Sequence, residues 1–429
     1  MSFLSGLSWK SKIGWGILLS YTSFEVCLQA RSKYVVYKRK QQLKTLNDDV
    51  SKFKSVTVAG MFVNPFEEYR PMTAFEFILV RCMELVESFY GNAVELHNKV
   101  PKNGKTVEVE DMLEQFKPDL EYLRENSALL HSSLANASGA DWSFRNNFTF
   151  TWLGQSCALL QMSGINIMTD PILGDHLISS HFGPKRLTKA PMTLGDIKYA
   201  TNDSLDFVLV SHDHPDHLEM KVASDIGNTS TWIVPLGLKK KLARKGIFRV
   251  IEMDWWDAVS LNQFFDGSLP DEYEVVCLPA MHWSGRYVLD SNQSLWCSFM
   301  IRRNGESIFY HAGDTGYSEE LFGAIAKKYG KLFFGLLPIG QYCPSWHQKP
   351  RHISPAESLK ISNLLSTKYM MGVHWGTFKL SSEPILEPRD LLLKLSKEQG
   401  TFPRYKTPES GRTYSYDLES GTETIHEGK

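Results

Sequence analysis

The sequence predicts an α/β sandwich with a helical extension at its N-terminus, and two observations carry this prediction. From about residue 147 onward, short runs rich in β-branched and aromatic residues alternate with helical stretches, which is typical of mixed sheets covered by helices. Several of the apolar runs end just before histidine or aspartate residues. Polar side chains at strand ends favour a functional site in the loops above a rigid scaffold.

The expected elements of this sandwich follow from hydrophobic periodicity. Strands are expected at 148–153, 158–162, 165–168, 206–210, 231–234, 274–278, 296–301, 307–310, 332–337 and 369–373. Helices are expected at 221–226, 319–329 and 355–366. Together these elements make 147–429 the predicted catalytic domain.

The composition is that of an ordinary globular chain. Hydrophobic residues make up 42% and charged residues 22% of the 429 residues, which allows one large domain with extensions. The net charge of -1 does not favour a nucleic-acid partner, whose phosphates need an excess of Lys and Arg. The six cysteines are scattered, and we expect buried small side chains rather than disulfides or a zinc finger.

Residues 1–45 are expected to be a targeting or membrane-anchor segment. The first 24 residues contain no acid, as in a mitochondrial transit peptide. An apolar stretch over 13–30, broken by Glu25, is flanked by basic residues but is shorter than the ~20 apolar residues that span a bilayer. A peripheral or amphipathic surface helix is the alternative. We expect membrane association, at the mitochondrial inner membrane or at another intracellular membrane.

Residues 46–146 are expected to form an N-terminal arm and a helical cap. Residues 61–71 resemble an ordered arm, and apolar residues at helical spacing predict helices over 75–95 and 112–134, with a turn at 101–104 between them. Two interpretations stay open for these helices: a simple packing pair, or an apolar cap that shelters lipid chains.

A dense set of metal-ligand side chains follows the strand expected at 206–210. His212, His214, Asp216 and His217 have the spacing H-x-H-x-D-H at a strand terminus. Alternate side chains of an extended backbone point to one side, so His212 and His214 can face one position while the next two face a second. Imidazole and carboxylate are ligands that zinc, manganese and iron accept.

Three more strands end at a residue of this kind. His282 follows the strand at 274–278, Asp314 follows 307–310, and His374 follows 369–373. A lone histidine after a strand is more often structural. Because the four apolar strands should deliver their ligands to one edge, the complete set predicts a metal site.

This ordered set resembles the signature of the metallo-β-lactamase superfamily. The resemblance implies a four-layered αββα sandwich and a two-metal site. The implied ligands are His212, His214 and His282 for the first metal, Asp216, His217 and His374 for the second, and Asp314 as a bridge between both.

Further stretches are similar to the family of phospholipases D that hydrolyse N-acyl-phosphatidylethanolamine. They extend in order from about residue 61 to 378 and include 62–65, 151–154, 169–171, 183–186, 234–237, 254–256, 312–317, 338–340 and 373–378. The resemblance implies two Zn²⁺ per chain, a phospholipid substrate, association with a membrane surface, and release of N-acylethanolamine and phosphatidic acid. It leaves a homodimer open.

The sequence departs from the mammalian pattern at two positions. Pro215 stands where those enzymes have Tyr, and Gln155 stands where they have His. Both lie near the metal motif, so they could alter substrate handling without removing a ligand. The resemblance also gives His352 a place near the phosphate; a solvated loop histidine is the alternative.

The reaction expected from this resemblance is attack of an activated water on the phosphorus of a lipid phosphodiester. Asp216, Asp314 and His352 are the expected catalytic residues, and His352 is also the expected substrate-binding residue. The alternatives are hydrolysis of another phosphodiester, a lactone or a thioester, and a metal-binding scaffold without turnover. The pair Trp255 and Trp256 could lie at a membrane interface or in the core.

Overall fold

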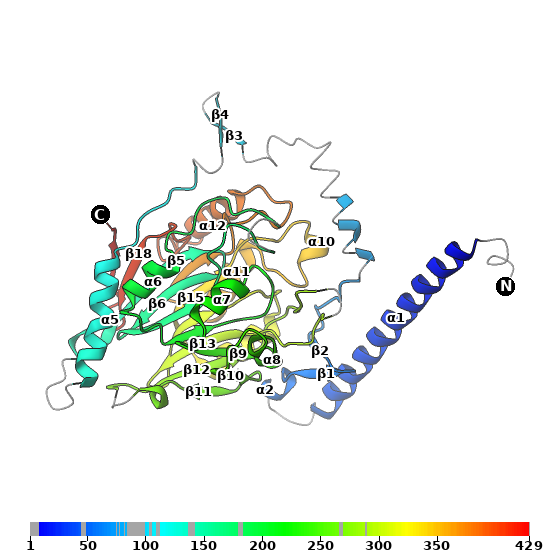
Figure 1. Cartoon of the computed structure of the whole chain (residues 1–429), viewed down its shortest axis with the longest axis horizontal. Helices are drawn as coiled ribbons and strands as arrows, with labels where there is room; N and C mark the ends of the chain where they lie inside the picture. Colours follow the sequence, from blue (N-terminus) through cyan, green and yellow to red (C-terminus); the bar gives the residue numbers. More distant parts are fainter. Residues whose placement is uncertain are drawn as a thin grey trace.

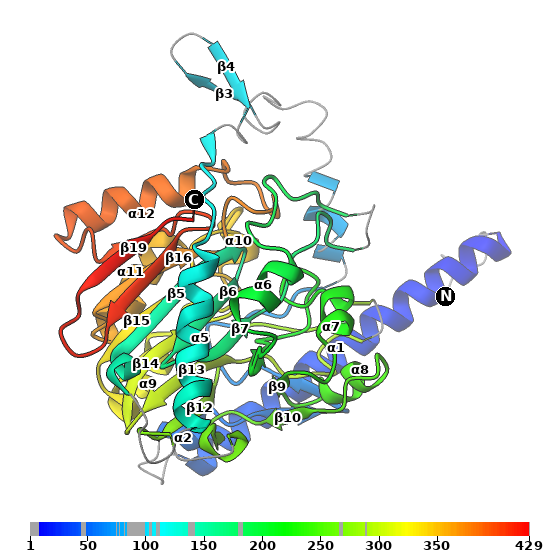
Figure 2. The ribbon, with the colours of Figure 1, turned by 60° about the vertical axis from the view of Figure 1, so that its left-hand side comes forward.

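Two β-sheets face each other and carry helices on their outer sides (Figures 1 and 2). The computed structural model of the chain describes residues 8–43, 49–73, 75–76, 78–80, 82–83, 99–102, 105–108, 112–135, 142–178, 183–265, 269–287 and 290–428. The layers are helices, sheet, sheet and helices, which confirms the predicted αββα sandwich.

The first sheet has eight strands in the order β10-β9-β8-β7-β6-β5-β18-β19. Its strands are β5 (Asn147–Gly154), β6 (Cys157–Met162), β7 (Ile165–Thr169), β8 (Phe207–Leu209), β9 (Thr231–Pro235), β10 (Val250–Met253), β18 (Thr413–Asp417) and β19 (Glu423–His426). The helices of its outer layer are α5 (Leu120–Ala135), α6 (Leu194–Ala200), α7 (Met220–Ile226) and α8 (Lys239–Ala243).

Strand β8 shows why this sheet is covered on both faces. Successive side chains of a strand point to opposite faces. Phe207 and Leu209 belong to the core between the sheets, whereas Val208 belongs to the core under the outer helices. All three are buried, as expected of an internal parallel strand.

The second sheet has seven strands in the order β11-β12-β13-β14-β15-β16-β17. Its strands are β11 (Ala258–Ser260), β12 (Tyr273–Leu278), β13 (Ser298–Arg303), β14 (Glu306–His311), β15 (Leu332–Pro338), β16 (Tyr369–Val373) and β17 (Tyr405–Lys406). The remaining helices of the catalytic half are α9 (Glu319–Tyr329), α10 (Ser345–Gln348), α11 (Pro355–Leu364), α12 (Glu387–Glu398) and the short 3₁₀ turns η2 (Ser143–Asn146) and η3 (Asn262–Phe264).

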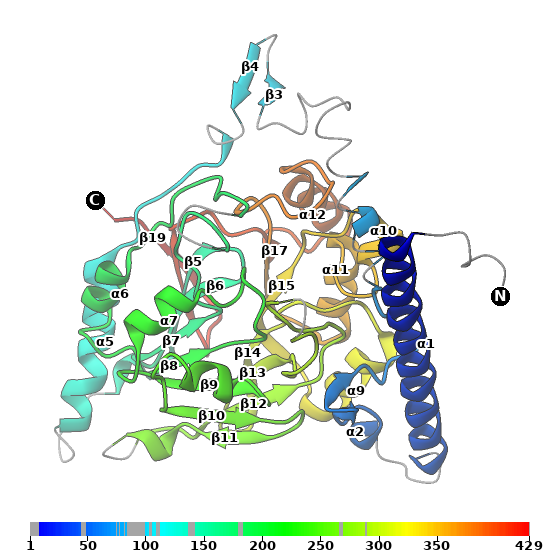
Figure 3. The ribbon, with the colours of Figure 1, turned by 45° about the vertical axis from the view of Figure 1, so that its right-hand side comes forward.

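The N-terminal region lies along the outside of the sandwich. Helix α1 (Trp9–Leu43) is a long rod beside the body (Figure 3), and none of its residues is buried. It is followed by α2 (Asp49–Lys52) and the hairpin of β1 (Val56–Val58) and β2 (Met61–Val63); a second hairpin joins β3 (Lys99–Lys102) and β4 (Lys105–Glu108). Among the described residues, no helix combines the length and apolar character required to cross a bilayer.

Helix α5 corrects the helix predicted over 112–134. The helix starts at Leu120, and residues 112–119 are not α-helical. Pro118 disfavours a helical residue before it. Asp119 then caps the helix, because its Oδ1 accepts the backbone N–H of Tyr122 at 3.1 Å. Leu123 and Leu130 are fully buried on the sheet side, so α5 is an outer layer of the sandwich and not a lipid-sheltering cap.

The other predicted helix and turn of this region are only partly described. The described residues between 75 and 83 are helical, and 84–95 lie outside the described residues. The residues around the predicted turn at 101–104 form the β3–β4 hairpin, in which Lys102 pairs with Lys105.

The structure decides between the two alternatives for the tryptophan pair and corrects part of the cysteine prediction. Trp255 is buried and donates its indole N–H to the backbone oxygen of Trp296, and Trp256 stacks on Tyr329 at 6.4 Å, so this pair packs in the core and not at a membrane interface. All six cysteines are free, but Cys27 and Cys82 are exposed because they lie on outer helical segments.

Candidate metal centre

One edge of the sandwich collects the C-terminal ends of β8, β12, β14 and β16. In the second sheet, β12 and β14 are both antiparallel to β13, and β15 and β16 are parallel to β14, so these strands end at the same edge. The loops that follow begin there and face one space. The predicted ligands follow these ends: 212–217 after β8, His282 after β12, Asp314 after β14 and His374 after β16.

The structure brings all seven predicted ligands together in two groups of four that share Asp314. The first ligand group is His212, His214, His282 and Asp314, and the second ligand group is Asp216, His217, His374 and Asp314. Every member is buried, and within each group the ligand atoms lie within 4.8 Å of one another. These groupings are the two sets implied by the family resemblance.

The first ligand group is built from three imidazoles. Nδ1 of His214 lies 2.8 Å from Nε2 of His212 and 3.2 Å from Nε2 of His282. Asp314 stands slightly farther away, with Oδ2 at 3.7 Å from Nε2 of His282. Ligand atoms around a tetrahedral zinc lie roughly 3.3 Å apart, given Zn–N bonds of about 2.0–2.1 Å. The spacing therefore suits one metal ion.

The second ligand group combines two imidazoles with two carboxylates. Nε2 of His217 and Nε2 of His374 are 3.2 Å apart. Asp314 reaches both, with Oδ2 at 3.2 Å from His217 and Oδ1 at 3.1 Å from His374. Asp216 completes the group, its Oδ2 lying 3.3 Å from Nε2 of His374.

The protonation of the first group favours a bound cation. Burial lowers the pKa of His214 and of His282 to about 3, and burial with repulsion from His217 lowers the pKa of His212 well below its usual value. These rings are therefore neutral. Nδ1 of His282 donates to the backbone oxygen of Arg351 at 2.9 Å, which leaves only a lone pair on Nε2. Neutral imidazole nitrogens that converge in a buried space favour a bound cation.

The second group has the opposite character. Burial disfavours its charged forms, but the carboxylates outweigh burial at the histidines. They raise the pKa of His374 to about 9 and the pKa of His217 well above its usual value. In return, the histidines hold the pKa of Asp216 and of Asp314 below their usual range. Without metal this group is a network of ion pairs.

Asp170 supports the second group through hydrogen bonds. Its Oδ2 accepts from Nδ1 of His217 at 2.7 Å, from Nε2 of His311 at 2.8 Å and from the hydroxyl of Ser211 at 2.8 Å. Burial opposes its ionisation, but His311 and His217 lower its pKa to about 2. Because Nδ1 of His217 is engaged, Nε2 faces Asp314 and is available to a metal.

Sequence reasoning did not assign this role to Asp170. The segment 169–171 entered only through the family resemblance, as a similar stretch without a function. One local signal exists: Asp170 follows the end of β7, the strand paired in parallel with β8, and therefore lies beside the H-x-H-x-D-H loop.

Gln155, at the position where the sequence departs from the mammalian pattern, touches two ligands. Its amide nitrogen lies 3.0 Å from Oδ2 of Asp216 and 2.9 Å from Nε2 of His374. Its backbone oxygen also accepts the N–H of His374 at 3.1 Å. Gln155 and His374 both have positive φ, at 50° and 63°, a conformation that side-chain-bearing residues rarely adopt and that concentrates at functional sites.

His352 lies beside both groups. Its ring centroid is 5.1 Å from that of His282 and 6.0 Å from that of His374, and its Nδ1 is 3.7 Å from Oδ2 of Asp314. Burial lowers its pKa well below the usual value, so the ring is neutral. The alternative of a solvated loop histidine is excluded, because His352 is buried.

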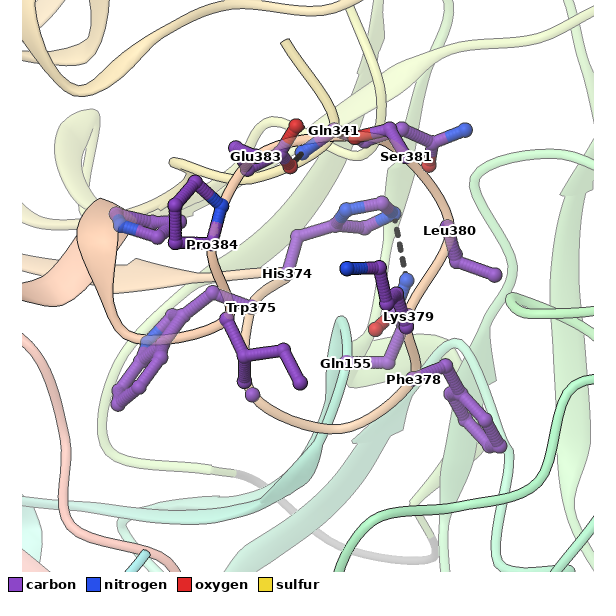
Figure 4. A pocket seen from close by; sticks show the side chains of 13 residues that line it. Gln155, Gln341, His374, Trp375, Phe378, Lys379, Leu380, Ser381, Glu383 and Pro384 are labelled. Carbon is purple, nitrogen blue, oxygen red and sulfur yellow. Dashed lines mark hydrogen bonds between the residues drawn. The ribbon is translucent and has the colours of Figure 1, made fainter. Parts of the chain in front are cut away.

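A small cavity of about 20 Å³ lies beside His374 (Figure 4). Figure 4 shows the side chains of Gln155 and Lys379 reaching toward His374. The amide oxygens of Gln155 and Gln341 are buried, and the described part of the chain supplies no donor to either. The cavity has room for about one water molecule, which could satisfy them.

Comparisons with known proteins show which chains this one is similar to. The description "Beta-lactamase superfamily domain" matches residues 165–375. The chain is 39% identical over 394 residues to the mitochondrial N-acyl-phosphatidylethanolamine-hydrolyzing phospholipase D of Saccharomyces cerevisiae, covering 88% of this chain and 81% of that protein. It is 34% identical over 287 residues to N-acyl-phosphatidylethanolamine-hydrolyzing phospholipase D 1 of Caenorhabditis elegans, covering 64% and 78%.

Solved structures with a similar fold share a lower sequence identity with this chain. A metallo hydrolase of Ignicoccus hospitalis shares 22% identity and covers 63% of this chain and 98% of its own, with a TM-score of 0.47. An isothiocyanate hydrolase from Delia radicum gut bacteria shares 16% identity and covers 62% and 98%, with a TM-score of 0.48.

Proposed function

Because this chain belongs to the family of N-acyl-phosphatidylethanolamine-hydrolysing phospholipases D, within the β-lactamase superfamily, we propose that it cleaves N-acylphosphatidylethanolamine into N-acylethanolamine and phosphatidic acid. One observation carries the proposal: two buried ligand groups share one carboxylate at the edge of the sandwich. In the reaction, water supplies a hydroxyl to phosphorus and a proton to the leaving oxygen of N-acylethanolamine.

The proposed cofactor is a pair of zinc ions, one in each ligand group. The fit rests on the neutral imidazoles of the first group, the spacing of ligand atoms in both groups, and the nitrogen and oxygen donors that zinc accepts. When bound, two such ions supply Lewis acidity toward the phosphate and water acidic enough to attack at neutral pH.

The chain's own residues then have separate tasks. Asp314 contacts both groups and fixes their separation, and Asp216 and Asp314 are carboxylates that can accept the proton of the attacking water. His352 is neutral and lies over Asp314, so it can donate one N–H to a phosphate oxygen and position the phosphodiester.

The proposed place of action is a membrane surface, because the substrate is a phospholipid. Helix α1 supports this proposal: it carries exposed apolar side chains such as Trp9, Ile13, Ile17 and Phe24, together with basic residues. The similar yeast enzyme is described as mitochondrial. We therefore propose a mitochondrial location, at the inner membrane.

The test is hydrolysis of N-acylphosphatidylethanolamine by the purified full-length protein, with both products identified by mass spectrometry and metal counted in the same sample. We expect stoichiometric release of N-acylethanolamine and phosphatidic acid, and loss of both after chelation. Turnover that persists in metal-free protein, or cleavage at another bond of the lipid, would contradict the proposal.

A further inference from the structure

An apolar groove runs between α1 and the arm that follows β2. Its volume is about 740 Å³, which lies in the range of small-molecule binding sites. We call it the α1 groove. On the helix side its apolar lining includes Tyr21, Phe24, Leu28 and Val36, which are spaced three, four and eight residues apart and lie on one face of α1.

The opposite wall belongs to the catalytic body. Phe62, Phe66 and Met72 line it, and Phe62 and Phe66 are buried members of the core between the sheets. Backbone N–H of Phe62 donates to the oxygen of Asn292 at 2.8 Å, which fixes this wall to a loop of the catalytic domain. The groove therefore has one wall that is anchored to the catalytic domain and one wall that is formed by α1.

Contacts at both ends of the groove hold α1 at a distance from the arm. Tyr21 meets Phe75 edge-on at 5.4 Å between ring centroids. At the other end, Nη1 of Arg39 donates to the backbone oxygen of Lys54 at 2.8 Å, and Lys40 pairs with Glu67 at 2.6 Å. No residue of α1 is buried, so the described residues leave the apolar face between these contacts at least partly accessible. Exposed apolar surface of this extent favours an apolar ligand.

The groove lies beside the candidate metal centre. Asn64 lines it, and the Nδ2 of Asn64 donates to the backbone oxygen of His282 at 2.7 Å. Tyr69 lines it as well and contacts Arg351, which precedes His352 and whose backbone oxygen orients His282. One layer of residues therefore separates the groove from a metal ligand and from the proposed phosphate-binding histidine.

The charge of α1 selects among apolar ligands. Between residues 8 and 43 there are seven Lys and Arg residues and a single acid, Glu25. Lys33 and Lys40 line the groove together with Glu25 and Glu67, so the charges of the lining itself balance. The excess of basic residues on α1 as a whole favours a chain that belongs to a lipid of an anionic membrane surface.

We propose that the α1 groove binds an acyl chain of the phospholipid whose phosphodiester lies at the two ligand groups. This inference rests on the proposed function and adds the location of the chain. The element that shelters lipid is then α1 and not α5, because α5 packs within the sandwich.

The experiment compares substrates of different chain length in one detergent micelle. One series varies the N-acyl chain and the other varies the glycerol-bound chains, so the two sources of an acyl chain are separated. The test variant is Leu28→Glu, which places a charge in the groove. The matched control is Val26→Glu, at an exposed position of α1 that does not line the groove.

We expect Leu28→Glu to raise KM for the long-chain member of one series at least tenfold and to leave the short-chain member within twofold. Val26→Glu should leave both within twofold. Because α1 has no buried residue, neither change threatens the sandwich, and circular dichroism checks this. Equal effects of the two variants, or effects that do not depend on chain length, would overturn the proposal that the groove binds an acyl chain. Hydrolysis by the wild type would still support the proposed function.

A wild type that hydrolyses none of the substrates rejects the proposed function, and the groove is then tested without turnover. A phosphatidic acid with a diazirine in its acyl chain is photolysed with the full-length protein, and the labelled peptides are sequenced. Labels within 21–40 and 61–72 support the groove, and labels confined to other segments overturn it.

Discussion

The two ligand groups share Asp314 but differ in protonation and in support. The first group has neutral imidazoles, because burial lowers the pKa of its histidines, and a backbone oxygen of Arg351 orients His282. The second group has histidines with raised pKa values, and the carboxylate of Asp170 lies behind His217. The first group is therefore ready for a cation, whereas the second must lose protons to bind one.

This difference explains why the second group needs more charged neighbours. Asp170 favours a cationic His217 when no metal is bound, and it holds the same ring with Nε2 toward the site when a metal replaces the proton. The ion-pair network thus keeps buried carboxylates satisfied in both states. The first group contains no acid apart from the shared Asp314, so its empty state costs unsatisfied lone pairs instead.

The largest expected effect comes from the residue that the groups share. Asp314→Ala should lower kcat by roughly 10³-fold or more and reduce the metal content of both groups, because it removes the only common ligand. His214→Ala should reduce metal in the first group alone. Metal content by mass spectrometry and kcat measure these effects, with His131→Ala on α5 as the control. Full metal content in Asp314→Ala would contradict the claim that both groups share this ligand.

The next effect belongs to the support of the second group. Asp170→Asn should weaken the second metal by about 10–100-fold and leave the first within a few-fold, because among the seven predicted ligands it is His217 that contacts the Asp170 carboxylate. A chelator competition titration with two resolved steps measures both affinities. Equal weakening of the two steps would mean that Asp170 supports the whole centre.

The pH dependence of stability separates the groups without a mutation. In metal-free protein, the folded-state pKa of His374 is about 9 and that of His217 is raised, against about 6.5 when unfolded. Their stabilisation is complete below about pH 6.5 and is lost as the pH rises through about 9, a change on the order of 3 kcal/mol for His374 alone.

Zinc should reverse this trend, because it holds the rings deprotonated and competes with protons. Denaturant midpoints at pH 6, 7.5 and 9, with metal and with chelator, measure both curves. His214 and His282, whose pKa values are lowered, add the opposite slope below about pH 7. If the free energy of unfolding of the chelated protein rose between pH 7.5 and 9, the histidines of the second group would be neutral in the metal-free state.

The smallest expected effect concerns the first group. Asn64→Ala removes one hydrogen bond to the backbone of His282, worth about 1 kcal/mol, and should weaken the first metal by roughly three- to tenfold. Gln155→Ala is the corresponding variant for the second group, because Gln155 contacts Asp216 and His374. It should weaken the affinity for the second metal. The same chelator titration distinguishes them; identical profiles for the two variants would remove the distinction between the groups.

The ligands were predictable because strand ends and ligand spacing are local features of the sequence. The H-x-H-x-D-H run and the residues after β12, β14 and β16 needed only the assumption that these strands end at one edge. Their supports were not predictable, because Asp170 and Asn64 reach the site from other loops and Arg351 contributes a backbone oxygen. The role of a backbone oxygen leaves no pattern of residue types in the sequence.

The same limit applies to the elements around the site. The ten strands and three helices predicted for the catalytic half are present, and α9 has the predicted bounds. The strands β10, β11, β17, β18 and β19 and the helices α6, α8, α10 and α12 were not predicted. The start of α5 was wrong because the apolar spacing over 112–134 continues across Pro118, although the helix does not. The α1 groove depends on a contact between Tyr21 and Phe75, which pairs two segments that are independent in sequence.

Anomalous diffraction from crystals of the zinc-loaded protein tests the shared-carboxylate centre most directly. Two zinc peaks are predicted, one among His212, His214 and His282 and the other among Asp216, His217 and His374, with Asp314 between them. A single peak, or a pair of peaks of which Asp314 contacts only one, would contradict the account.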